Sequence, residues 1–170
     1  MSFGRRLILI RHAKAEPFAA TDLARELTDR GRRDAEAAGR FLCDRGLVPD
    51  HAVVSPAVRT RQTWEVMERI LESGAQVVYD DSVYSGSPEV VLESLRYVPP
   101  DTEVLVFVGH QPTIGYLTHM LEDGAGDPEA LHQLLHGFPT SATAVLEVDL
   151  PWEELAPETA RLVAFHSGTP

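Results

Sequence analysis

The stretch LILIRHAKAE, residues 7–16, decides the fold, because it joins a short apolar run directly to charged and ionisable side chains. Residues 7–10 have the length and composition of a buried β-strand. A buried strand normally ends in turn residues, whereas this one ends on Arg11 and His12, with the only lysine of the chain, Lys14, shortly after. Cations at the end of a buried strand need a functional explanation.

The rest of the chain alternates apolar runs with segments of helical period. Three further strands are expected at residues 52–54, 76–79 and 104–108. Helices should begin near capping residues or prolines and bury apolar side chains at three- and four-residue intervals; their start signals are Thr28, Ser55-Pro56, Ser87-Pro88 and Pro112. This alternation is typical of a parallel sheet covered on both faces. The expected class is α/β, a three-layer α/β/α sandwich with a mostly parallel central sheet.

The C-terminal region follows a different pattern. Residues 142–149 alternate in polarity and residues 160–166 form a second strand candidate; both are expected at or near a sheet edge, with antiparallel pairing as one option. Before them, residues 122–139 contain three glycines and two prolines and are interpreted as a linker. A length of 170 residues with 44% hydrophobic content suits one ordinary core, so we expect one domain over residues 1–170.

Charge and cysteine content exclude several classes of function. The formal net charge of −11 argues against nucleic acid or an anionic membrane as a partner, because both are bound through broad basic surfaces. Residues 1–69 hold 13 basic and 10 acidic side chains, whereas residues 70–170 hold 2 and 16. Cations can still gather locally around one phosphoryl group, since charges are screened within about 8 Å. A single cysteine, Cys43, and the lack of a bilayer-spanning segment predict a cytoplasmic protein without internal disulfides.

Three of the expected strands are followed by arginine or histidine residues at the same edge of the sheet. Ligands of parallel α/β sheets bind beyond the carboxyl ends of the strands. The first strand ends in Arg11-His12, the second is followed by Arg59, and the fourth ends in His110. Arginine forks match phosphoryl oxygens, and an imidazole whose second nitrogen is held by a hydrogen bond can attack phosphorus. Because phosphoryl transfer needs mainly positioning and charge stabilisation, these four side chains suffice without a metal.

The same residues carry a family resemblance that covers nearly the whole chain. The blocks occur in this order: Arg11-His12-Ala13, Leu27-Thr28 with Gly31, Ser55-Pro56 with Arg59-Thr60 and Gln62-Thr63, and Gly109-His110. They resemble the histidine phosphatase superfamily, also called phosphoglycerate mutase-like. The forms RHAKAE and GHQP look most like its SixA-type branch, the phosphohistidine phosphatases. The resemblance implies a phosphoglycerate mutase-like fold, a phosphate-accepting nucleophile at His12, and a phosphoryl group held by Arg11, Arg59 and His110.

The sequence departs from the family pattern at the proton donor. Larger members resemble one another in carrying an acidic donor after the third strand, where this chain has only the short link YDDSVYSGSPE, residues 79–89. Asp80, Asp81 and Glu89 in this link are candidates, of which we select Asp81, and Glu16 near the first motif is an alternative donor. A missing acid matters for an alkoxide leaving group and much less for phosphohistidine, whose imidazole leaves neutral when its distal nitrogen carries a proton. Lys14 is a candidate for contact with phosphate or peptide, with a solvent-exposed loop lysine as the alternative.

The resemblance and the short insertions together predict a phosphatase for protein phosphohistidine. It would form a covalent phosphohistidine intermediate, release inorganic phosphate and need neither cofactor nor metal. Without an inserted cap, the pocket should be shallow and suit a residue on a protein surface. Two alternatives stay open: a phosphomonoesterase for a small metabolite or phosphoserine, and a phosphate-binding regulatory module with slow turnover. His132 and His136 have the i,i+4 spacing of helical zinc ligands but no third ligand, so no metal site is expected.

Overall fold

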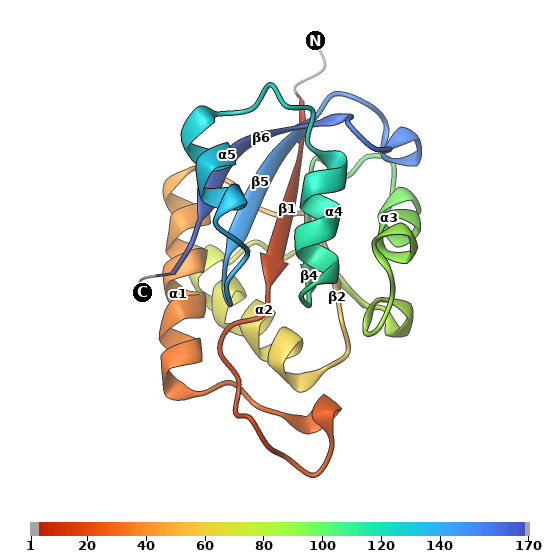
Figure 1. Cartoon of the computed structure of the whole chain (residues 1–170). Coiled ribbons are helices and arrows are strands. Elements are labelled where there is room, and N and C mark those ends of the chain that lie inside the picture. Colours follow the sequence, from red (N-terminus) through yellow and green to blue (C-terminus); the bar gives the residue numbers. More distant parts are fainter. Residues whose placement is uncertain (1–3, 169–170) are drawn as a thin grey trace.

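A mixed sheet of six strands lies between two layers of helices in the computed structural model, which describes residues 4–168 (Figure 1). The strands, in their order across the sheet, are β3 (Gln76–Tyr79), β2 (His51–Val54), β4 (Val104–Gly109), β1 (Arg5–Arg11), β5 (Thr143–Val148) and β6 (Ala160–His166). The first four are parallel, whereas β5 pairs antiparallel with β1 and β6 pairs antiparallel with β5. The predicted three-layer α/β/α sandwich and the two C-terminal strands at one side of the sheet are confirmed.

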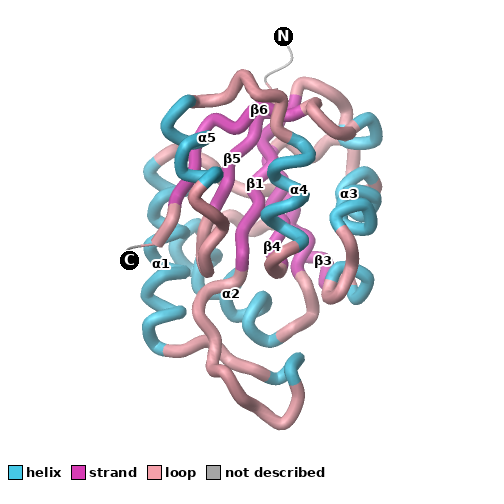
Figure 2. Tube along the Cα trace, viewed as in Figure 1, coloured by secondary structure: helices cyan, strands magenta, loops and turns pink. Residues whose placement is uncertain are grey.

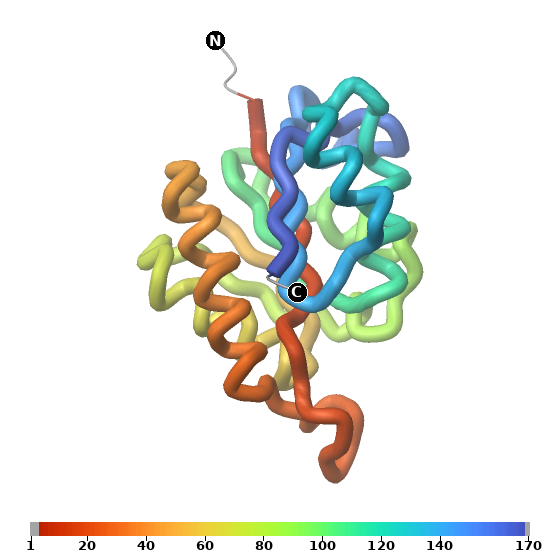
Figure 3. The backbone as a smooth tube through the Cα atoms, turned by 60° about the vertical axis from the view of Figure 1, so that its left-hand side comes forward, coloured from red at the N-terminus to blue at the C-terminus, as the bar shows by residue number. Residues whose placement is uncertain are grey.

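Each face of the sheet carries its own helices and its own apolar cluster. The helices are α1 (Asp29–Asp44) and α2 (Val58–Leu71) on one face and α3 (Pro88–Arg96), α4 (Thr113–Leu121) and α5 (Pro128–Leu135) on the other (Figure 3). In β1, Leu7 and Leu9 belong to the cluster under α3–α5, and Ile8 and Ile10 to the cluster under α1 and α2. Successive strand side chains point to opposite faces, so a strand covered on both sides must be apolar throughout.

The helices are short and bury one face each. The longest, α1, has 16 residues, and Ala35, Ala38 and Leu42 are on its buried side. No helix between residues 4 and 168 is long and apolar enough to cross a membrane.

The predicted helix starts are confirmed at three positions and wrong at a fourth. Pro112 directly precedes the first residue of α4. Thr28 accepts a hydrogen bond from the Gly31 amide at 2.9 Å, and Ser87 accepts one from the Val90 amide at 3.3 Å. Ser55-Pro56, in contrast, does not cap α2, whose first residue follows Ala57 without a side-chain cap. The reason is that Ser55 still extends the sheet: its amide donates to the Val108 carbonyl at 3.1 Å, so the chain turns only afterwards.

The segment predicted as a linker, residues 122–139, contains the helix α5. Asp127 accepts a hydrogen bond from the Ala130 amide at 2.9 Å, and Pro128 occupies the first turn. This start signal is equivalent to Ser87-Pro88, which the sequence analysis did use. Ala130 and Leu134 are buried in the cluster beneath α3–α5, so α5 covers the C-terminal strands.

The connection from β1 to α1, residues 12–28, protrudes beyond the carboxyl end of the sheet as a long loop with one short helical turn (Figure 2). Its base is closed by an antiparallel bridge between Ala15 and Leu27 and by the Thr28 amide, which donates to the Lys14 carbonyl at 3.0 Å. A Cβ atom on Gly31 would lie 2.0 Å from that same Lys14 carbonyl oxygen. Only glycine at this position therefore lets α1 approach the backbone that follows His12.

Replacing Gly31 by alanine should lower the free energy of unfolding by about 2 kcal/mol, because overpacking a filled site costs roughly 1–3 kcal/mol. Urea denaturation of the two proteins measures the difference. Arg33→Ala, at an exposed position of the same helix, is the control and should stay within about 0.5 kcal/mol of the parent. A Gly31→Ala protein as stable as the parent would show that Lys14 does not pack on α1 in this way.

Candidate active site

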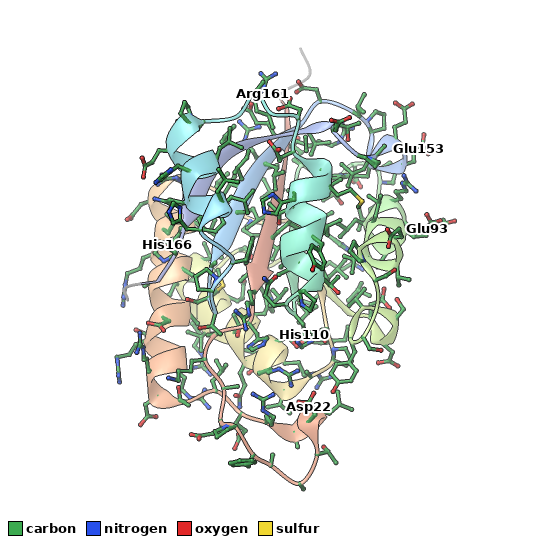
Figure 4. All side chains as sticks on the ribbon, in the orientation of Figure 1. Asp22, Glu93, His110, Glu153, Arg161 and His166 are labelled. Carbon is green, nitrogen blue, oxygen red and sulfur yellow. The ribbon has the colours of Figure 1, made fainter. Side chains whose placement is uncertain are left out.

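The carboxyl ends of β1, β2 and β4 meet at one edge of the sheet. In the parallel ladder Arg11 pairs with Gly109, and Val54 pairs with Val108. The His12 amide donates to the Gly109 carbonyl at 3.0 Å, which joins the chain after β1 to the end of β4. His110 lies at this end of the molecule, next to the protruding loop that carries Asp22 (Figure 4). The expected meeting of Arg11, His12, Arg59 and His110 therefore has its structural basis in strand register.

His12 is a buried imidazole, 8% exposed, with one nitrogen engaged and one free. Its Nδ1 lies 2.7 Å from the carbonyl oxygen of Ala13. A carbonyl can only accept, so Nδ1 carries the proton and Nε2 keeps its lone pair. Burial lowers the pKa of His12 to about 4, against the opposing effect of the Ala13 hydrogen bond and with further lowering by Arg59 and Arg11. At neutral pH the side chain is a neutral imidazole whose orientation is fixed by the Ala13 carbonyl.

His110 faces His12, with ring centroids 5.4 Å apart. Its Nδ1 lies 3.3 Å from Arg59 Nη2, and its Nε2 lies 2.7 Å from the hydroxyl of Ser55. A guanidinium can only donate, so Nδ1 accepts from Arg59 and the proton sits on Nε2, which donates to Ser55. Burial, followed by the charge of Arg59, lowers the pKa of His110 to about 3. The second imidazole is neutral as well.

The two arginines keep unpaired donors at the site. Arg11 Nη1 donates to the Phe138 carbonyl at 3.0 Å, while Arg59 Nη1 and Nη2 donate to Asp22. The Nε atoms of both arginines are buried and have no partner among the described residues. A buried donor without an acceptor costs about 1–3 kcal/mol, and most such groups in native proteins are satisfied. Two such donors on adjacent cations indicate a pocket for an anion.

Three other residues predicted from the sequence are not brought into this group. Lys14, Glu16 and Asp81 are exposed. The Lys14 carbonyl binds Thr28, and the Glu16 carbonyl accepts from Arg25 Nε at 2.7 Å. Within residues 4–168, no hydrogen bond or ion pair joins these three side chains to the two histidines or their arginines. Substrate contact by Lys14 and proton donation by Glu16 or Asp81 stay predictions.

Three residues that the sequence analysis did not assign to the site contact it. Ser55 binds His110, as described above, and Asp22 forms an ion pair with Arg59 at 3.1 Å. Tyr84 donates its hydroxyl to Asp22, and its ring lies edge-on to His110 with centroids 5.6 Å apart. Hydrogen bonds from Tyr84, Arg25 and Arg59 hold the pKa of Asp22 far below its usual range. These contacts join residues 37 and 62 positions apart, for which the sequence contains no periodic signal.

A cavity and a pair of histidines lie outside the group around His12. A cavity of about 630 Å³ lies between β3 and α3, with Val78, Val90 and Tyr97 in its lining, and none of its lining residues belongs to the group around His12. His132 and His136 have rings 4.5 Å apart, but His136 Nδ1 is engaged with the His132 carbonyl at 2.8 Å. In the part of the chain that the structure describes, no group of three or more His, Cys, Asp or Glu residues is arranged to hold a metal ion.

The free energy of unfolding should fall as the pH is lowered from about 7 to about 4, in part because of His12 and His110. An unfolded histidine titrates near pH 6.5, whereas these two folded imidazoles titrate near 4 and 3, so the unfolded chain binds more protons in this interval. Urea denaturation at both pH values should show a smaller acid loss for His12→Asn than for the parent. His119→Asn, at an exposed position, should lose as much unfolding free energy between the two pH values as the parent does. Equal losses in all three proteins would contradict a contribution from His12.

The site belongs to a chain with recognisable relatives. Residues 7–83 match the family model of the histidine phosphatase superfamily, branch 1. A Nakamurella multipartitia structure, provisionally assigned as the phosphohistidine phosphatase SixA, is 34% identical with a TM-score of 0.88 and 99% of both chains covered. An Agrobacterium tumefaciens structure with the same provisional assignment is 31% identical with a TM-score of 0.78, covering 98% of this chain and 99% of the other.

A further structure shares the fold. The protein histidine phosphatase SixA complexed with tungstate is 23% identical with a TM-score of 0.78, covering 95% of this chain and 96% of that one. The predicted phosphoglycerate mutase-like architecture is thereby confirmed. The chain belongs to the histidine phosphatase superfamily and, within it, to the SixA-type branch.

Proposed function

We propose that the chain is a metal-independent phosphatase that removes the phosphoryl group from protein phosphohistidine, through a covalent phosphohistidine at His12. Family membership gives the coarser conclusion, a phosphatase of this superfamily. The observation that carries the finer one is the state of the His12 ring, whose Nδ1 donates to Ala13 while Nε2 keeps its lone pair. A module that only binds phosphate has no need of a buried, neutral nucleophile beside its cations.

In the first step, His12 Nε2 attacks phosphorus, and the Nε2–P bond forms as the P–N bond of the substrate breaks. The electron pair of the broken bond stays on the leaving nitrogen. The substrate imidazole enters with its distal nitrogen protonated and leaves as neutral histidine. His12 keeps its Nδ1 proton, whose hydrogen bond to Ala13 stabilises the positive charge that develops on the ring. The unpaired Nε–H groups of Arg11 and Arg59 serve the equatorial oxygens.

In the second step, water attacks the phosphorus atom of phosphorylated His12. The Nε2–P bond breaks and its electron pair returns to Nε2. Both protons of the water end on the product, which leaves as dihydrogen phosphate. His12 is then again neutral with its proton on Nδ1, so the cycle needs no protein acid to protonate the imidazole.

His110 contributes through a change of partner. In the free site its Nδ1 accepts from Arg59 Nη2, so this nitrogen has no proton to offer a phosphoryl oxygen. A bound phosphoryl dianion draws the Arg59 donor toward itself and favours the charged form of a neighbouring imidazole. His110 then takes up a proton from solvent at Nδ1 and, as an imidazolium, donates a hydrogen bond from this N–H to an oxygen of the phosphoryl group, while Ser55 continues to hold Nε2.

The surroundings of the site favour an imidazole over an alkoxide as leaving group. Among the described residues, Asp22 is the carboxylate that pairs with Arg59, and it accepts hydrogen bonds from Arg59, Arg25 and Tyr84. With its pKa held low, it has no proton to donate at neutral pH. An alkoxide needs such a proton, whereas a protonated phosphohistidine does not.

A protein substrate is supported by the exposed loop beside the site. Residues 16–24, which include Asp22, the partner of Arg59, are exposed throughout, so the surface of a protein substrate can contact this loop. Two solved structures above 30% identity are provisionally named phosphohistidine phosphatases, and the SixA complex holds tungstate, an oxyanion. A phosphomonoesterase for a small metabolite or phosphoserine is the alternative within the same chemistry.

A covalent adduct should form on His12. Brief incubation with a ³²P-labelled phosphohistidine protein, followed by separate alkaline and acid quenches, should leave label on the enzyme after alkali and little after acid, because phosphohistidine is acid-labile. His12→Ala should carry no label and lose turnover, while it still binds inorganic phosphate. Label that survives acid, or full turnover by His12→Ala, would exclude this mechanism.

A substrate panel separates the leading proposal from its alternatives. At equal substrate concentration, the protein should turn over a phosphohistidine protein faster than a phosphoserine protein or small phosphate esters. The reason is that the imidazole of phosphohistidine leaves without an added proton, whereas an alkoxide leaving group needs one. Excess chelator should not change the rate, since Arg11 and Arg59 supply the positive charge. A preference for any ester would favour the phosphomonoesterase, and phosphate binding without turnover of any substrate would favour the regulatory module.

A further inference from the structure

We propose that Asp22, itself held by Tyr84, is a positioning residue that orients Arg59 for the phosphoryl group. The inference rests on the proposed phosphatase function of the site. It assigns a role to the exposed loop between β1 and α1, which contacts the active site through Asp22.

The guanidinium of Arg59 uses its two edges differently. Its end edge, formed by Nη1 and Nη2, is occupied: Nη1 donates to the Asp22 backbone carbonyl at 2.9 Å and Nη2 to the Asp22 carboxylate at 3.1 Å. Its side edge, formed by Nε and Nη2, is turned toward His110: Nη2 also reaches His110 Nδ1 at 3.3 Å, and the buried Nε has no partner among the described residues. The side edge is the two-donor fork that matches a phosphoryl group.

The exposed fractions of the Arg59 and Asp22 side chains agree with this use of the two edges. The Arg59 side chain is 7% exposed, whereas the Asp22 side chain is 51% exposed. The carboxylate therefore lies on the solvent side of the guanidinium, and the free fork lies on the buried side, beside the two histidines. Asp22 does not occupy the place of the phosphoryl group, and a substrate can bind without displacing it.

Asp22 needs its own support, because an exposed loop carboxylate is otherwise mobile. Arg25 Nη1 donates to Asp22 Oδ1 at 3.0 Å, and the Tyr84 hydroxyl donates to Oδ2. The Tyr84 ring lies edge-on to His110 at 5.6 Å. Tyr84 thus connects the carboxylate that orients Arg59 with the imidazole that shares the phosphoryl group. A fixed fork also avoids part of the rotamer entropy that a free arginine loses on binding.

The effect of substitutions at Asp22 on phosphate binding distinguishes positioning from competition. If Asp22 positions Arg59, Asp22→Ala should weaken inorganic phosphate binding and lower kcat/KM by about tenfold to 100-fold. Asp22→Asn, which keeps an acceptor oxygen, should fall between Ala and the parent, and Tyr84→Phe should show a smaller loss with the ring contact intact. Calorimetric titration with phosphate and steady-state kinetics measure both quantities. Phosphate binding by Asp22→Ala that equals or exceeds that of the parent overturns the proposal.

A double-mutant cycle tests whether Asp22 acts through Arg59. In an Arg59→Ala background, Asp22→Ala should add little further loss of phosphate affinity, whereas independent loss in both backgrounds would indicate a merely structural role and overturn the proposal. Glu65→Gln, an exposed acidic position on α2, controls for net charge and should bind phosphate like the parent. Thermal unfolding of each variant checks that the chain is folded.

The role of Asp22 and the phosphatase function can fail independently in these experiments. A protein that binds phosphate in an Asp22-dependent way but does not hydrolyse phosphohistidine would keep this inference and refute the function. A protein that hydrolyses phosphohistidine equally well with and without Asp22 would refute this inference alone.

Discussion

The parallel pairing of β4 with β1 and β2 is the constraint on which the site depends. Parallel strands place their carboxyl ends at one edge, and the register of β1 on β4 sets Arg11 beside Gly109. The next residue of each chain segment is a histidine, and the His12 amide closes the ladder onto Gly109. The strand register thereby brings the two imidazoles close together, with ring centroids 5.4 Å apart.

The electrostatics of the site are set by two neutral imidazoles that lie beside two arginine side chains. Both histidines are desolvated and lie close to Arg59 and Arg11, which lowers the pKa of each well below neutrality. In the free site the positive charge is therefore carried by the guanidinium groups and not by the two imidazoles. A chain with a net charge of −11 can bind a phosphoryl group in this way because the positive charge is local and partly buried.

The sequence predicted the architecture and the central side chains from two strong signals. Runs that are apolar throughout predicted the buried strands. Arginine and histidine residues directly after three of these strands predicted the edge of the sheet at which the side chains meet. Weak signals explain what it missed. The helix α5 was hidden in a glycine-containing segment although Asp127-Pro128 marked its start, and Ser55 was assigned to a cap because its role in extending β2 is a property of pairing. Asp22 and Tyr84 approach each other across 62 residues through an exposed loop, where no periodicity constrains the sequence.

We propose that one phosphoryl group binds between His12, His110 and two arginines, with His12 Nε2 in line with its phosphorus atom. A crystal structure of the protein with bound orthovanadate tests this placement. Vanadium should be bonded to His12 Nε2, with the Nε–H groups of Arg11 and Arg59 and a nitrogen of His110 within hydrogen-bond distance of its oxygens. Vanadate bound elsewhere on the chain, or bound here with His12 Nε2 turned away from the metal, would contradict it.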